Sequence, residues 1–81
     1  MDPDAALKEL LDTVGSRDWD RVEELASGLL SWMEKRGFPP ITLGPKELGR
    51  NWHCTLATFV CYAAQAKVRD ARKRRSRKRG G

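Results

Sequence analysis

The stretch RDWDRVEELASGLLSWMEKRGFPP, residues 17–40, decides the fold. Its apolar residues return every three or four positions, which is the period of one face of an α-helix. That face consists of Trp19, Val22, Ala26, Leu29, Leu30 and Met33. Acidic residues gather near its start, and Lys35 and Arg36 stand near its end, an order that complements the helix dipole. The stretch therefore predicts an amphipathic helix over residues 17–36.

Residues that cap or stop helices stand at both ends of this segment. Ser16 is suited to cap the first turn. Gly37 and the following Phe38-Pro39-Pro40 forbid continuation, because proline lacks the amide hydrogen that a helix needs. Residues 38–43 are few and largely apolar, so we expect them to pack across the helices as an ordered strap.

A second amphipathic segment precedes the first. Asp2 and Pro3 provide a helix cap and a first helical residue, and Gly15 is the expected end. The apolar residues between them, again three and four apart, are Leu7, Leu10, Leu11 and Val14. The turn to the next helix is short, so the two helices should form an antiparallel hairpin.

A third helix is expected after the strap. It begins either at Pro45 or, after a short turn interrupted by Gly49, at Asn51. Its expected buried face consists of Leu48, Trp52, Leu56, Phe59, Val60, Ala63 and Ala66. The apolar pattern ends at Ala71. The sequence thus predicts an all-α fold: a compact three-helix bundle over residues 1–71, made of the antiparallel hairpin and a long third helix, followed by a flexible basic C-terminal arm, residues 72–81.

Charge is distributed unevenly along the 81 residues, whose net charge is +5. Residues 1–36 hold five basic and nine acidic side chains, whereas residues 37–81 hold eleven basic and two acidic. Nine of the basic side chains stand close together near the C-terminus: Lys67, Arg69, Arg72, Lys73, Arg74, Arg75, Arg77, Lys78 and Arg79. A cluster of one sign at this density favours an anionic partner.

Six of these nine residues are arginine, whose planar guanidinium fits two phosphate oxygens at once. We expect the nine to bind nucleic acid, DNA or RNA, through phosphate contacts that do not depend on base sequence. Lys46 and Arg50 are possible auxiliary phosphate contacts. The expected function is that of a nucleic-acid-binding accessory protein.

A second interpretation stays open. The protein could be a structural or adaptor subunit that binds another protein, or a second copy of itself, through its helical surface. The third helix, with its many alanines, and Trp32 would then make the specific contact, and the arm would reinforce it.

Patterns for catalysis and metal binding are weak. His53 and Cys54 are adjacent, and Cys61 lies two helical turns further on, but zinc sites usually take ligand pairs at close spacing. Neighbouring helix positions point about 100° apart, so His53 and Cys54 do not form a nucleophile pair. We expect a non-catalytic protein without a metal or another cofactor.

The location expected for this chain is reducing: cytoplasmic, or alternatively virion-like. Cys54 and Cys61 on one helix lie about 10.5 Å apart along its axis, which is too far for a disulfide. The N-terminal residues lack the pattern of a signal peptide. No apolar run approaches the ~20 residues that span a bilayer, so we expect no membrane span.

Residues 30–40, LSWMEKRGFPP, follow an acidic amphipathic helix. In this order, residues 16–40 resemble the end of a helical hairpin found in short uncharacterised bacterial proteins. The resemblance covers less than half of the chain and does not include the basic arm. It implies a helical hairpin and brings no activity with it.

Overall fold

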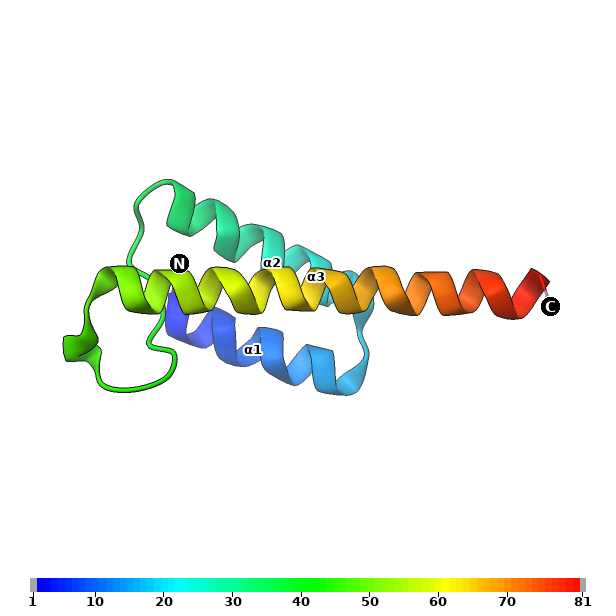
Figure 1. Cartoon of the computed structure of the whole chain (residues 1–81), viewed down its shortest axis with the longest axis horizontal. Helices are drawn as coiled ribbons and strands as arrows, with labels where there is room; N and C mark the ends of the chain where they lie inside the picture. The colour runs from blue at the N-terminus through cyan, green and yellow to red at the C-terminus, as the bar shows by residue number, and fades with distance from the viewer. Residues whose placement is uncertain (1, 81) are drawn as a thin grey trace.

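The computed structural model describes residues 2–80, with side chains up to Lys73. In chain order the helices are α1 (Pro3–Ser16), α2 (Trp19–Glu34), the short 3₁₀ helix η1 (Lys46–Leu48) and α3 (Arg50–Gly80). Helices α1 and α2 form a hairpin, and α3 lies across both and continues past their connection (Figure 1). The predicted all-α three-helix architecture is confirmed. The flexible arm was predicted to begin at residue 72, but Arg72 and Lys73 continue α3, and the side chains of the arm beyond Lys73 lie outside the described part.

The turn between α1 and α2 lies one or two residues later than the sequence suggested. Helix α1 runs through Gly15, and Arg17 takes the left-handed conformation, with φ 62°. The Asp18 amide donates to the Thr13 carbonyl at 3.1 Å, which closes the end of the helix. The Asp18 carboxylate then accepts from the Arg21 amide at 3.4 Å. Asp18, and not Ser16, therefore caps α2.

The end of α2 explains why the chain has glycine at position 37. Arg36 takes the left-handed conformation, with φ 67°, so Gly37 is not needed for that purpose. A Cβ atom at Gly37 would lie only 2.3 Å from the Trp32 ring. The Trp32 indole covers this glycine and donates from Nε1 to the Phe38 carbonyl at 2.7 Å. Gly37 is needed for space, and Trp32 fixes the start of the strap.

A buried histidine holds the strap to the start of α3. His53 is 2% exposed. Its Nδ1 accepts from the Thr42 amide at 3.0 Å, and its Nε2 lies 2.9 Å from the Pro45 carbonyl. Since an amide only donates and a carbonyl only accepts, the ring hydrogen is on Nε2. Gly49, with φ 98°, separates η1 from α3, so the alternative with a short turn before the helix is confirmed.

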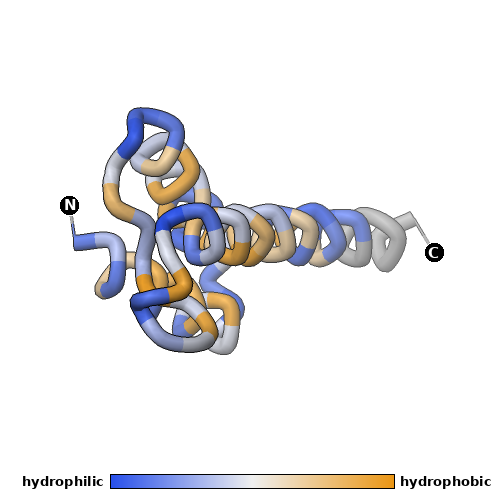
Figure 2. Tube along the Cα trace, turned by 60° about the vertical axis from the view of Figure 1, so that its left-hand side comes forward, coloured by the Kyte–Doolittle hydropathy of each residue, from blue (hydrophilic) through white to orange (hydrophobic). Residues whose placement is uncertain are grey.

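The core lies between the hairpin and a face of α3 that consists mostly of small residues. Its members are Leu7, Leu10, Val22, Ala26, Leu29, Met33, Ala57, Cys61, Ala64 and Val68. The face predicted for α3 was wrong, because Phe59 is 71% exposed and Trp52 is 46% exposed. Ala57, Cys61 and Ala64 let α3 approach the hairpin closely, and large rings would hold it away. Figure 2 shows the apolar residues giving way to hydrophilic ones along α3.

Candidate nucleic-acid interface

The basic residues are carried by the part of α3 that leaves the hairpin. Val68 is 1% exposed and is the last core residue on α3. Lys67, Arg69 and Lys73 are exposed around it. Arg69 and Lys73 stand one helical turn apart, on the side of α3 that is turned away from the hairpin. The described structure therefore presents these cations on the flank and outer side of one helix.

Arg72, the fourth described cation of the cluster, is bound within the molecule. Its guanidinium lies 3.1 Å from the Glu23 carboxylate and 3.5 Å from that of Asp20. Both acids belong to the first two turns of α2. The groups are at least half exposed, so each pair contributes at most about 1 kcal/mol. The sequence did not predict these ion pairs of Arg72, because residue spacing does not show which helix lies next to the arm. We call them the Arg72 clamp.

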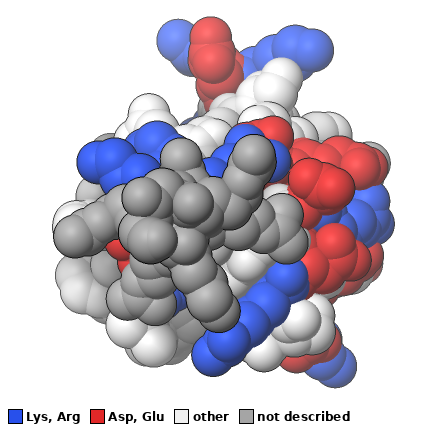
Figure 3. All heavy atoms as spheres, turned by 90° about the vertical axis from the view of Figure 1, so that its right-hand side faces the viewer, with Lys and Arg blue, Asp and Glu red and all other residues white. Residues whose placement is uncertain are grey.

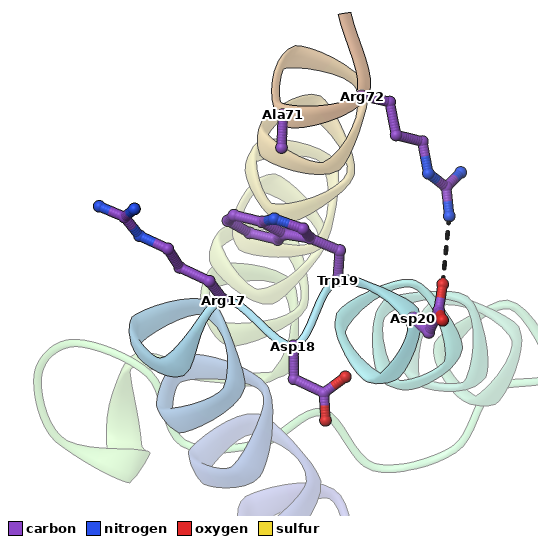
Figure 4. A pocket seen from close by; sticks show the side chains of 6 residues that line it. All are labelled: Arg17, Asp18, Trp19, Asp20, Ala71 and Arg72. Carbon is purple, nitrogen blue, oxygen red and sulfur yellow. Dashed lines mark hydrogen bonds and ion pairs between the residues drawn. The ribbon is translucent and has the colours of Figure 1, made fainter. Parts of the chain in front are cut away.

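A tryptophan supports the same junction. Figure 4 shows the Trp19 ring lying between the hairpin turn and Ala71, while Arg72 reaches across to Asp20. The hollow lined by these residues has a volume of about 260 Å³. Pockets for small molecules usually measure about 300–1,000 Å³, so this hollow is small for a ligand. The residues around it join α3 to the start of α2 through the ion pairs of Arg72.

Acidic side chains gather on one side of this end of the molecule (Figure 3). Arg21 lies among them, 2.6 Å from Glu9 and 2.7 Å from Glu24. Glu9 and Glu24, together with Asp20 and Glu23, give the α1–α2 side an excess of negative charge. A phosphate backbone approaching α3 would be repelled from that side. Arg69 and Lys73 face a different direction, which leaves the outer side of α3 open to anions.

The remaining predicted contacts fall outside the described side chains. These are Arg74, Arg75, Arg77, Lys78 and Arg79. The backbone of α3 passes through all five positions. The structure therefore places the nine predicted residues along one helical segment and assigns an intramolecular partner to Arg72.

Arg50 begins α3, about 33 Å along the helix from Arg72 at 1.5 Å per residue, and Lys46 belongs to η1 just before it. Arg50 donates to the Gly37 carbonyl at 3.0 Å, so it also ties α3 to the end of α2. Both residues line a hollow of about 650 Å³ beside Phe38 and Ile41. They are not brought together with the arm, and a single phosphate group does not reach both places.

The surroundings of His53, Cys54 and Cys61 indicate that these residues serve the fold. Both ring nitrogens of His53 have hydrogen-bond partners, Nδ1 with the Thr42 amide of the strap and Nε2 with the Pro45 carbonyl. Cys54 and Cys61 are free thiols, and burial raises the pKa of Cys61 to about 11. Among the described residues, no three of the His, Cys, Asp and Glu side chains come together as metal ligands.

No helix in the described part of the chain has the length and apolar character needed to cross a bilayer. Comparison with protein-family models, curated proteins and solved structures finds no match for this chain. Function is therefore inferred from the geometry and charge of the residues themselves.

Proposed function

We propose that this protein is a non-catalytic accessory protein that binds nucleic acid through the basic segment of α3. The observation that carries the proposal is the placement of nine cations on one helix where it leaves the hairpin. Asp70 is the one acid among residues 67–79. Phosphate contacts of this kind give affinity and orientation and do not read bases.

The dimensions of the basic segment suit a nucleic-acid strand. From residue 67 to residue 79 the helix rises about 18 Å. Along the axis of B-DNA, each strand carries a phosphate about every 3.4 Å, so the segment has the axial length of about five phosphates. A single helix also fits the DNA major groove, which is about 12 Å wide. Contacts to about five phosphates are therefore a reasonable expectation for duplex DNA.

The ion pairs of Arg72 do not prevent such binding. Both pairs are exposed, so exchanging Asp20 and Glu23 for a phosphate costs little. The negative side of the hairpin would favour a pose in which nucleic acid lies along the outer side of α3. The acidic hairpin then faces solvent or another partner. The two free thiols support a reducing, cytoplasmic location for this activity.

The proposal is tested by comparing two variants with the same change in net charge. In the first, Lys67, Arg69 and Lys73 are changed to Gln; in the second, Lys8, Lys35 and Arg36 are changed to Gln. All six side chains are exposed, so both variants should fold. Anisotropy of a labelled duplex and of a labelled single strand should show a clear loss of affinity for the first variant and little change for the second. Equal losses would mean that only total charge matters, and no loss in either would refute a role for Lys67, Arg69 and Lys73 in the contact.

One observation favours a second candidate function, that of a protein-binding adaptor. Phe59 and Tyr62 are 71% and 58% exposed on α3, although aromatic side chains usually pack inside small domains. Trp32 does not contribute to this surface, because it is half-buried against Gly37. An adaptor would bind nucleic acid weakly even at low salt, and it would still bind its protein partner after the arm charges are removed.

A further inference from the structure

A seam of regularly spaced residues runs along the outer side of α3. Its members, alternately three and four positions apart, are Trp52, Thr55, Phe59, Tyr62, Ala66, Arg69 and Lys73. At 100° per residue the centre of this outer seam lies about 170° around the helix from the buried face. The outer seam therefore faces away from the hairpin along the whole described length of α3.

Alternating steps of three and four are the spacing with which one helix packs on another in a coiled coil. Residues of the outer seam occupy the core positions of such a pairing over three heptads. Within the chain, the hairpin already covers the opposite face of α3. On the outer seam, the Trp52 indole donates from Nε1 to the Leu43 carbonyl at 2.8 Å, whereas Phe59 and Tyr62 lie mostly in solvent. Three large aromatic side chains at these positions remain exposed: Trp52 at 46%, Phe59 at 71% and Tyr62 at 58%. An exposed row of this kind indicates an interaction surface.

We infer that the outer seam pairs with the outer seam of a second copy of this chain, and that the two α3 helices run antiparallel. The distribution of charge decides the orientation. In a parallel pair, Arg69 and Lys73 of the two copies would meet each other, and the two basic arms would lie side by side. In the antiparallel pair each cationic end meets the aromatic end of the other helix. Repulsion therefore disfavours the parallel pair and favours the antiparallel pair.

The spacing also gives the register. When Phe59 faces Tyr62 of the second copy, Thr55 faces Ala66 and Trp52 faces Arg69, and each contact occurs twice. The centre then holds four aromatic rings, which favour edge-to-face or offset packing. At each end the Arg69 guanidinium of one copy lies over the Trp52 indole of the other, and such a cation–π contact contributes about 0.5–1 kcal/mol at an exposed site. When two copies of the outer seam run in opposite directions, complementary side chains therefore lie opposite each other.

The available area is sufficient for a modest dimer. The exposed parts of Trp52, Phe59 and Tyr62 amount to about 350 Å² in each copy, taking about 200 Å² for a whole aromatic side chain. Two copies would bury about 700 Å² of aromatic surface, and a specific interface needs about 1,000 Å² in total. Thr55, Ala66 and the stem of Arg69 would supply the rest. A dimer of this size should dissociate on dilution.

The dimer would place the two basic arms at opposite ends of the assembly. Each arm extends α3 away from the shared seam (Figure 1), so the arms of an antiparallel pair point in opposite directions. Because Arg69 contacts the second copy in this dimer, the phosphate contacts would be made by the basic residues beyond it. Such a dimer can hold two separate nucleic-acid segments, or two sites on one, which raises affinity through effective concentration. The pairing itself does not depend on nucleic acid, and it can be tested in its absence.

Sedimentation equilibrium over a wide range of protein concentration tests the pairing. Phe59→Gln removes a central ring without changing charge, and Phe38→Gln is the matched control, since Phe38 is 79% exposed on the strap. The native chain and the Phe38→Gln variant should dimerise with similar dissociation constants, whereas Phe59→Gln should weaken dimerisation at least tenfold. Circular dichroism will show that both variants keep their helices. A native chain that stays monomeric at every concentration would overturn the inference.

Disulfide trapping tests the orientation. Thr55→Cys and Ala66→Cys are made separately with Cys54 changed to Ala, while Cys61 remains buried and unreactive. An equal mixture of the two proteins should form mainly the mixed disulfide on mild oxidation, because antiparallel helices bring positions 55 and 66 together. Predominant pairing of like with like would refute the antiparallel arrangement. If Phe59→Gln instead abolishes binding to a single strand while the native chain is monomeric, the outer seam is a base-stacking surface and the dimer is refuted.

Discussion

Because α3 packs on the hairpin through its small residues, two substitutions only two positions apart should differ sharply in their effect on stability. Ala57 is fully buried between the helices, and Phe59 is 71% exposed. Replacing Ala57 with Leu adds three carbon atoms where α3 lies close to the hairpin. Overpacking of this kind costs about 1–3 kcal/mol. Replacing Phe59 with Ala removes a ring that lies mostly in solvent, and exposed substitutions usually change stability by less than about 0.5 kcal/mol.

Thermal unfolding followed by circular dichroism measures both effects. A loss of 1 kcal/mol lowers Tm by about 4–8 °C in a domain of this size, so Ala57→Leu should lower Tm by at least that amount. Phe59→Ala should shift Tm by only a few degrees when measured at a concentration where the protein is monomeric. If Phe59 were in the core, its replacement would instead cost about 3–5 kcal/mol and could unfold the chain. A large loss for Phe59→Ala together with a neutral Ala57→Leu would refute the orientation of α3.

Four further outcomes are expected. His53→Ala leaves the Thr42 amide and the Pro45 carbonyl without their partner and should cost about 1–3 kcal/mol in denaturant unfolding; an unchanged midpoint would show that the strap does not depend on the ring. A double-mutant cycle between Arg72 and Glu23 should give a coupling below about 1 kcal/mol that fades with added salt, because the pair is exposed. Burial raises the pKa of Cys61 from 9.0 to about 11, so its contribution to stability is complete below pH 9 and is lost as the pH rises towards 11. Cys61→Ala should lose less stability than the native chain over this range, and at neutral pH a thiol reagent should modify Cys54 before Cys61.

The helices could be predicted because local signals determine them. Asp2 and Pro3 start α1 as expected, and Val22, Ala26 and Leu29 form the buried face of α2 at the predicted spacing. These features depend on residues close together in the chain, so periodicity and caps are enough to find them.

The orientation of α3 could not be predicted in the same way. Its apolar residues surround the helix on several sides, so periodicity offers more than one possible buried face. Hydrophobicity favoured the face with Trp52 and Phe59, whereas the packing distance to the hairpin favoured the small side chains of Ala57, Cys61 and Ala64. That distance is a tertiary property, and no local pattern reports it.

The residue types of the candidate site could be predicted from the sequence, but their contacts could not. The run of Lys and Arg after Ala66 is visible in the sequence, and it leads directly to the expectation of an anionic partner. The pairing of Arg72 with Asp20 and Glu23 joins residues about fifty positions apart, and only the folded chain brings them together. The acidic start of α2 therefore has a second role beyond its favourable place at a helix N-terminus.

The central claim is that the basic segment of α3 binds nucleic acid through phosphate contacts. The most direct test is the salt dependence of binding to duplex DNA, measured for the native chain and for a variant with Arg74, Arg75, Arg77, Lys78 and Arg79 changed to Gln. With about five phosphate contacts, log affinity should fall against log salt with a slope near −4.5, which is about 500-fold between ~50 and ~200 mM salt. The variant should bind every sequence more weakly and show a much flatter slope. An unchanged slope and affinity in the variant would contradict the claim, because the contacts would then lie outside the basic arm.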